Sequence, residues 1–103
     1  MSTKEEVMQA LDDVEDPELK LSIVELGLVY DVRFELKEGV QHAEIDMTLT
    51  SPGCPAAAEI MAATHRAALN AVESVHINLV WSPRWDPKVH ANEDARMDMG
   101  IWD

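Results

Sequence analysis

The sequence predicts a two-layer α+β domain, in which a small mixed three-stranded sheet carries helices on one face, in the order α-β-β-α-β-α. Two runs of alternating apolar and polar residues flank a Lys-Glu-Gly turn, which is typical of an antiparallel hairpin. An alanine-rich run with helical spacing separates this hairpin from a third alternating run. Because each strand has one polar face, we expect helices on the other face only.

The first element is a helix at about Lys4–Asp12. Thr3 and Glu6 have the spacing of a capping box, and the apolar residues that follow recur at helical intervals. The next segment, 14–27, sustains neither period, so it is expected to be a long loop with room for one helical turn. Long ordered loops in small domains tend to be functional.

The remaining elements follow from periodicity. Residues 28–36 and 43–50 alternate as strands of the hairpin, and 55–72 form a helix whose buried side is small. The third strand covers 75–81, and its Trp81 is expected to fill the core. A short last helix, capped by Asn92 and ended by Gly100, completes the chain.

Composition indicates one domain over residues 1–103. The chain is 47% hydrophobic and carries 20 acidic against 8 basic residues, for a net charge of -12. This charge repels phosphate backbones and anionic lipids, so neither nucleic acid nor a membrane is an expected partner. No apolar run approaches the ~18 residues of a membrane span, and one cysteine cannot form an intramolecular disulfide. We therefore expect a cytoplasmic protein.

The only cysteine, Cys54, lies in the turn Thr50-Ser51-Pro52-Gly53-Cys54-Pro55 between the second strand and the alanine-rich helix. A proline at the first helical position would place Cys54 at or beside the helix N-cap. Unpaired backbone N–H groups there favour a thiolate. This position predicts a reactive thiol, whereas a lone cysteine elsewhere is more often a buried core residue.

Topology predicts which segments surround this turn. In the hairpin, the start of the first strand lies beside the end of the second, so loop 16–27 neighbours Cys54. A helical crossover makes the third strand parallel to the second, which brings segment 81–87 to the same edge. Three irregular segments are thus expected to converge around one thiol.

Four motifs follow one another along nearly the whole chain: Asp16-Pro17-Glu18, the run Ile23–Val32, the run Met47–Pro55, and Trp85-Asp86-Pro87. Together they resemble the SufT/PaaD-like family of iron–sulfur (metal–sulfur) cluster assembly factors. The resemblance implies an accessory, non-enzymatic role in maturing cytosolic iron–sulfur proteins, with scaffold or client proteins as partners. It also implies that Cys54 is the functional thiol and that the supporting residues are Asp16, Glu18, Thr50, Ser51, Gly53 and Trp85.

Several of these residues also have a structural interpretation. Asp16 could cap a helical turn that begins at Pro17, and Glu18 could be a first-turn carboxylate favoured by the helix dipole. Thr50 could simply end a strand. Trp85 could be either a lid over the site or a packing residue.

No stably bound cofactor is expected. Iron–sulfur clusters usually take four protein thiolates, and this chain offers one. A transient cluster between the subunits of a homodimer, with Cys54 as a ligand and small thiols or carboxylates completing the coordination, stays open. The four histidines lack the paired spacing of a zinc site and are expected at the surface.

Two other functions are compatible with parts of this sequence. A cysteine hydrolase or transferase needs a base near Cys54, and only His90 is expected on that side of the sheet, outside the four motifs. Such catalysis is therefore not favoured. The alternative is a structural interaction module, such as an accessory subunit for assembly of a metalloenzyme complex, in which Cys54 is inert.

Overall fold

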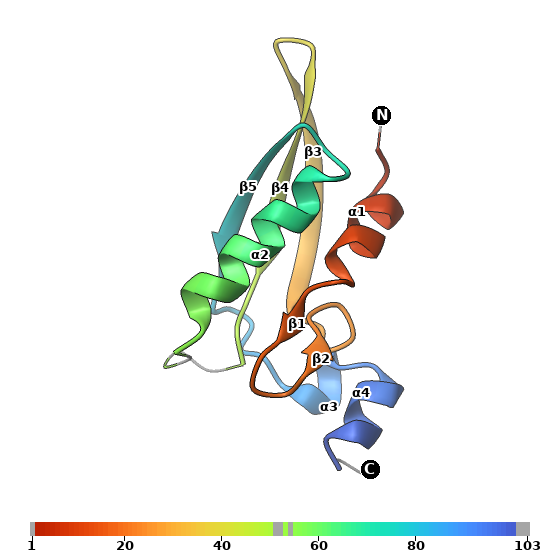
Figure 1. Cartoon of the computed structure of the whole chain (residues 1–103), viewed down its shortest axis with the longest axis vertical. Coiled ribbons are helices and arrows are strands. Elements are labelled where there is room, and N and C mark those ends of the chain that lie inside the picture. Colours follow the sequence, from red (N-terminus) through yellow and green to blue (C-terminus); the bar gives the residue numbers. More distant parts are fainter. Residues whose placement is uncertain (1, 51–52, 54, 101–103) are drawn as a thin grey trace.

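The computed structural model describes residues 2–50, 53 and 55–100, and its elements follow the predicted order with three additions (Figure 1). The additions are the short strands β1 and β2 and the helix α3. The elements are α1 (Lys4–Leu11), β1 (Glu15–Asp16), β2 (Leu21–Ser22), β3 (Val29–Lys37), β4 (Val40–Met47), α2 (Ala57–Leu69), β5 (Ser74–Leu79), α3 (Pro87–His90) and α4 (Glu93–Asp98).

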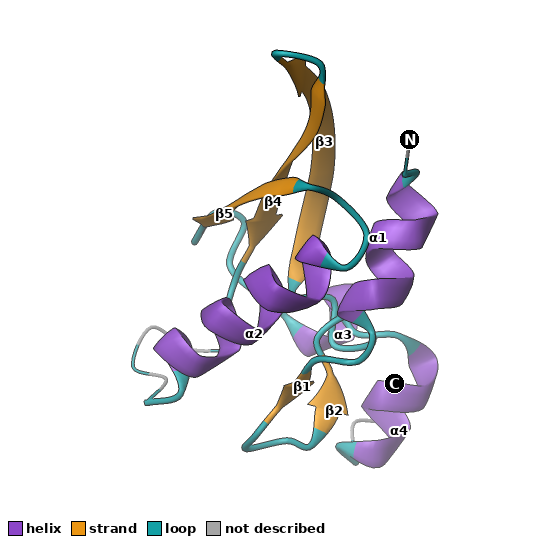
Figure 2. Ribbon diagram, turned by 45° about the horizontal axis from the view of Figure 1, so that its top comes forward, coloured by secondary structure: helices purple, strands orange, loops and turns teal. Residues whose placement is uncertain are grey.

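The main sheet has the strand order β3-β4-β5. β3 and β4 pair antiparallel, with Phe34 opposite Ala43, and β5 pairs parallel to β4, with Ile77 opposite Ile45. The predicted hairpin and helical crossover are therefore confirmed. Helices α1 and α2 cover one face of this sheet, as the two views in Figures 1 and 2 show together.

Local chemistry explains both long helices. At α1 the predicted capping box is present: Glu6 N–H donates to Thr3 Oγ1 at 3.2 Å, and Thr3 N–H donates to Glu6 Oε1 at 3.2 Å. In α2, Ile60, Thr64 and Ala68 recur every four residues and are buried. Small buried side chains allow α2 to lie close to the sheet.

The beginning of α2 differs from the prediction. Pro55 was expected at the first helical position, but the helix begins at Ala57 and its N-cap is Ala56, which makes no side-chain capping bond. Pro55 instead belongs to the turn that precedes the helix. The prediction was wrong because proline suits a turn as well as a first helical turn.

Segment 14–27 is more ordered than the sequence indicated. It folds into a two-stranded ribbon in which Glu15 pairs with Ser22 and Asp16 with Leu21. The intervening turn is closed by a bond from Lys20 N–H to the Asp16 carbonyl at 2.7 Å. Strands of two residues are too short to produce a detectable period, so sequence patterning missed them.

Trp81 does not fill the core, contrary to the prediction: 43% of its surface is exposed. β5 ends at Leu79, and the last backbone bond beside β4 runs from Val80 N–H to the Met47 carbonyl. Trp81 follows that bond, so the alternation that predicted its burial no longer applies.

The opposite sheet face carries a network of polar side chains. Arg33 forms two bonds to Asp46, one of them at 3.0 Å, and Asn78 donates to both Asp46 and Glu44. His42 contacts Glu44 through one ring nitrogen and Ser74 through the other. His42 is only 6% exposed, which corrects the prediction that all four histidines lie at the surface.

The C-terminal segment folds back against the start of β3 and the residues that precede it. Asn92 N–H donates to the Glu25 carbonyl at 2.8 Å, and the Tyr30 hydroxyl donates to the Pro83 carbonyl at 2.9 Å. Gly27, with φ of +73°, lies so close to His90 that an added Cβ would be 1.9 Å from the His90 carbonyl oxygen. This crossing requires glycine for both backbone conformation and space.

We predict that Gly27→Ala lowers the free energy of unfolding by more than about 2 kcal/mol, because strain and a backbone clash add together. Gly39→Ala is the matched control, since Gly39 also has positive φ (+81°) but nothing lies within 4 Å of an added Cβ. That control should lose only about 1 kcal/mol. Urea unfolding followed by circular dichroism measures both, and equal losses would contradict the close contact.

We also predict acid sensitivity from the polar sheet face. The bond from Arg33 holds the pKa of Asp46 below its usual value, and bonds from His42 and Asn78 do the same for Glu44. These carboxylates therefore stabilise the fold fully above about pH 4.5, and this stabilisation is lost as the pH falls through their lowered pKa values.

Asp46→Asn should lower the free energy of unfolding at pH 7 and should flatten its decline between about pH 5 and pH 2. The exposed Asp13→Asn is the control for the change in net charge. Urea unfolding at a series of pH values measures both slopes. A slope that is the same for the two variants would contradict the role of Asp46.

Candidate functional site

The predicted site lies at the end of the main sheet where β3 begins and where β4 and β5 end. Val29 pairs with Met47, and Met47 with Leu79, so these three strand ends are adjacent. The ribbon β1–β2, the start of α2 and the segment after β5 all lie toward this end, away from the β3–β4 turn (Figure 1). Cys54 and Ser51 fall outside the described residues, whereas their neighbours Gly53 and Pro55 are exposed.

Asp16 is buried, with 1% of its surface exposed, and has the structural role that the sequence offered as one interpretation. Its Oδ1 accepts hydrogen bonds from the backbone N–H groups of Glu18 at 2.8 Å and Leu19 at 3.2 Å, which closes the ribbon turn. Its Oδ2 is buried and has no hydrogen-bond partner among the residues that the structure describes. The turn therefore accounts for the burial of Oδ1 but not for that of Oδ2.

Thr48 is a residue that the sequence analysis missed. Its side chain is fully buried, and its Oγ1 is, with Asp16 Oδ2, one of two buried side-chain oxygens without a hydrogen-bond partner in the described part of the chain. Alternation placed Thr48 on the outer face, but Met47, Thr48 and Leu49 are all buried where β4 ends. An unpaired buried hydroxyl costs about 1–3 kcal/mol, and such groups in native proteins often have a functional reason.

Thr50 and Trp85 border the same end of the sheet. Thr50 is half-buried in the segment that follows β4. Trp85 packs against the core, and its Nε1–H donates to the Leu26 carbonyl at 2.7 Å. Trp85 thus holds the C-terminal segment to the loop before β3, which is the packing role rather than the lid.

His90, the one histidine expected on this side, is used structurally. Its ring stacks on Tyr30 with centroids 5.1 Å apart, and its Nδ1 accepts a hydrogen bond from Asp86 N–H at 2.9 Å. Partial burial raises the pKa of Tyr30. No group of three or more histidine, aspartate or glutamate side chains with metal-binding geometry occurs in residues 2–50, 53 and 55–100.

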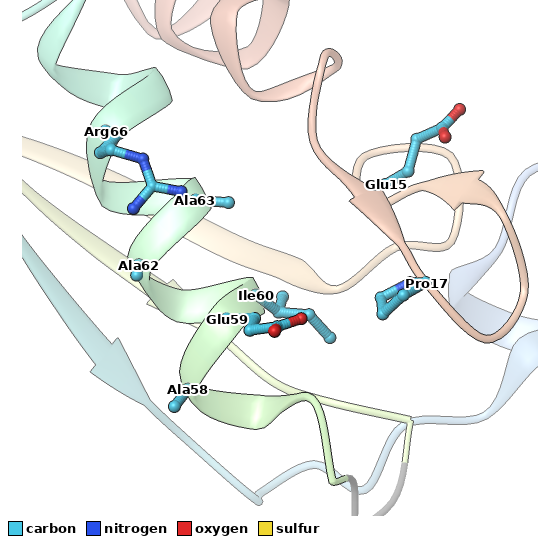
Figure 3. A pocket seen from close by; sticks show the side chains of 8 residues that line it. All are labelled: Glu15, Pro17, Ala58, Glu59, Ile60, Ala62, Ala63 and Arg66. Atoms are coloured by element: carbon cyan, nitrogen blue, oxygen red, sulfur yellow. The ribbon is translucent and has the colours of Figure 1, made fainter.

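A groove of about 550 Å³ separates the ribbon from α2 (Figure 3). The ribbon contributes Glu15 and Pro17, and α2 contributes Ala58, Glu59, Ile60, Ala62, Ala63 and Arg66. In Figure 3, Pro17 and Ile60 point toward each other across the groove. No sequence pattern predicts this groove, because the ribbon that forms one of its walls has no sequence signal.

The sequence profile of a family described as iron–sulfur cluster assembly proteins matches residues 4–78. The chain belongs to this family. The match includes the ribbon, the hairpin, the Cys54 turn, α2 and most of β5, so it covers both walls of the groove.

Family members of known name extend the likeness beyond this region. The iron–sulfur protein maturation auxiliary factor YitW of Bacillus subtilis is 46% identical over 100 residues, which cover 95% of this chain and 94% of YitW. The auxiliary factor SufT of Staphylococcus aureus is 46% identical over 88 residues, which cover 84% of this chain and 96% of SufT.

A solved structure of this fold comes from a Bacillus anthracis domain of unknown function. It is 35% identical, with a TM-score of 0.82, and the match covers 96% of this chain and 92% of that one. The resemblance inferred from the four motifs and the α+β fold class are therefore confirmed. Among the described residues of this chain, no helix is long and apolar enough to cross a membrane.

We predict that Trp85→Phe lowers the free energy of unfolding by about 1–3 kcal/mol, because the Leu26 carbonyl loses its donor and the smaller ring packs less well against the core. Trp81→Phe is the control, because Trp81 is 43% exposed and should change stability by less than about 0.5 kcal/mol. Thermal and urea unfolding measure both variants. A neutral Trp85→Phe would argue for a mobile ring and against the packing role.

Proposed function

We propose that this protein is an accessory factor that helps cytosolic iron–sulfur proteins acquire their clusters, and that Cys54 is its reactive group. The observation that carries the proposal is the family match over residues 4–78, joined to maturation factors that share 46% identity. The names of these relatives describe auxiliary factors, so the role that we propose is not an enzymatic one.

The environment of the Cys54 turn supports a reactive thiol. Its neighbours Gly53 and Pro55 are exposed, and Ala56, the N-cap of α2, provides no side-chain acceptor for the first N–H groups of that helix. An uncapped helix N-terminus favours a nearby negative charge, including a thiolate. A cysteine close to this point is thus in a setting that suits thiolate formation.

Three residues are proposed to support the thiol: Asp16, Glu18 and Thr50. Asp16 has a buried oxygen left over after it closes the ribbon turn. Glu18 lies in the same turn with an exposed side chain, and Thr50 lies four residues before Cys54. A nearby carboxylate could accept the S–H proton of Cys54, and carboxylate and hydroxyl oxygens could be further ligands for iron that a partner delivers.

The iron–sulfur cluster is cargo in this proposal and not a resident group. One chain offers one thiolate, and clusters usually require four protein ligands, so partner thiols or carboxylates must complete the coordination. Cys54 would bind iron only while a scaffold or client protein is engaged. A homodimer that bridges a cluster is one form of the same proposal, with two of the thiolates supplied by this chain.

The decisive experiment replaces Cys54 with serine. Serine is nearly isosteric with cysteine, and the neighbouring residues are exposed. The free energy of unfolding of Cys54→Ser, measured by thermal unfolding, should therefore lie within about 1 kcal/mol of that of the unmodified protein. Cys54→Ser should nevertheless fail to restore the activity of an iron–sulfur enzyme in cells that lack the unmodified gene. Thr3→Ser, which keeps a cap at α1, is the matched control and should restore that activity fully.

Alkylation of the native protein gives an independent reading of the same group. A reactive thiol should be labelled by iodoacetamide within minutes and without unfolding. Labelling that appears only in denaturant, together with full activity of Cys54→Ser in cells, would favour the interaction module with an inert cysteine.

A further inference from the structure

The groove between the ribbon and α2 has walls of a kind that suits a bound polypeptide. Two apolar residues, Pro17 and Ile60, face each other across it, and the helix side presents the small side chains of Ala58, Ala62 and Ala63. Small side chains allow a second backbone to approach closely. On α2, the lining residues start at Ala58 in the first turn of the helix, four residues after Cys54 in the sequence.

The helix wall also carries two opposite charges. Glu59 and Arg66 are both exposed, and neither takes part in any ion pair of the described residues. They are seven residues apart on α2, about 10 Å along the axis at 1.5 Å per residue. An extended chain in the polyproline II conformation rises about 3.1 Å per residue with three residues per turn, so side chains three positions apart lie on the same side at about this distance. The groove is therefore complementary to a short segment with a basic and an acidic side chain at that spacing.

We propose that this groove binds an extended segment of an iron–sulfur scaffold or client protein, in which a basic and an acidic residue about three positions apart flank small apolar side chains. The basic residue pairs with Glu59 and the acidic residue with Arg66. This inference rests on the function proposed above, because it assigns the surface by which that partner is held. A second copy of this chain is a different occupant, which the experiment below distinguishes.

A photo-cross-linking residue with a thin, flexible side chain, a diazirine derivative of lysine, in place of Ala62 of the full chain tests the proposal in cells without filling the groove. Ala62 is exposed, so the substitution should leave the fold intact, which a melting curve checks. The control places the same group at Gln9, an exposed residue of α1 that lines a different, smaller groove. The cross-linked peptide is then sequenced by mass spectrometry.

The expected result is an adduct at Ala62, absent at Gln9, to a scaffold or an iron–sulfur protein at a segment with the paired charges. Arg66→Glu or Glu59→Lys should each reduce its yield about two- to fivefold, the effect of one exposed ion pair. Lys4→Glu, which makes the same charge change as Arg66→Glu but on α1, should not reduce it. An adduct to a second copy, an adduct to a segment without the paired charges, or equal yields at Ala62 and Gln9 would overturn the proposal.

The two proposals fail differently. If Cys54→Ser does not restore enzyme activity while Ala62→Trp, which fills the groove, restores it fully, the groove inference is wrong and the thiol function stands. If Cys54→Ser restores activity while Ala62→Trp does not and the cross-link reports a bound client, the groove stands and the thiol role falls. Gln9→Trp is the control for an added indole on a helix surface.

Discussion

The parallel pairing of β5 with β4 is the constraint from which the site follows. Antiparallel neighbours can be joined by a tight turn, but a parallel pair needs a crossover, and here α2 supplies it. The crossover requires the chain to leave β4 at one end of the sheet and turn directly into α2. The Cys54 turn is that exit, and β5 must finish at the same end, which brings the C-terminal segment to it as well.

Because of this arrangement, the two ends of the sheet differ in how tightly they are packed. At the hairpin end, Phe34 and Leu36 extend beyond the helices and are exposed, so that end contributes little core. At the site end, Gly27, Trp85 and Asn92 join the loop before β3 to the C-terminal segment by close contact and hydrogen bonds. The residues around the proposed site are thus held by a scaffold of backbone contacts.

Much of the fold could be predicted because its elements are long enough to show a period. The capping box at Thr3, the pairing of the hairpin strands and the buried side of α2 follow from local patterns, and each one is confirmed. The ribbon, the groove beside Pro17 and the exposure of Trp81 could not be predicted. They depend on where short segments meet in space, and no sequence spacing reports that.

Asp16 has one role that a local sequence pattern predicts and one feature that only the structure shows. Its place ahead of Pro17 predicted a turn cap, and one carboxylate oxygen acts as that cap. An asparagine or serine could cap the turn without burying a second acidic oxygen, which is costly when it has no partner. Selection for stability alone would therefore not favour aspartate here. Asp16 Oδ2 and the hydroxyl of Thr48 are both buried without a hydrogen-bond partner in the described part of the chain. These two unpaired oxygens are the physical reason to look for function at this end of the sheet.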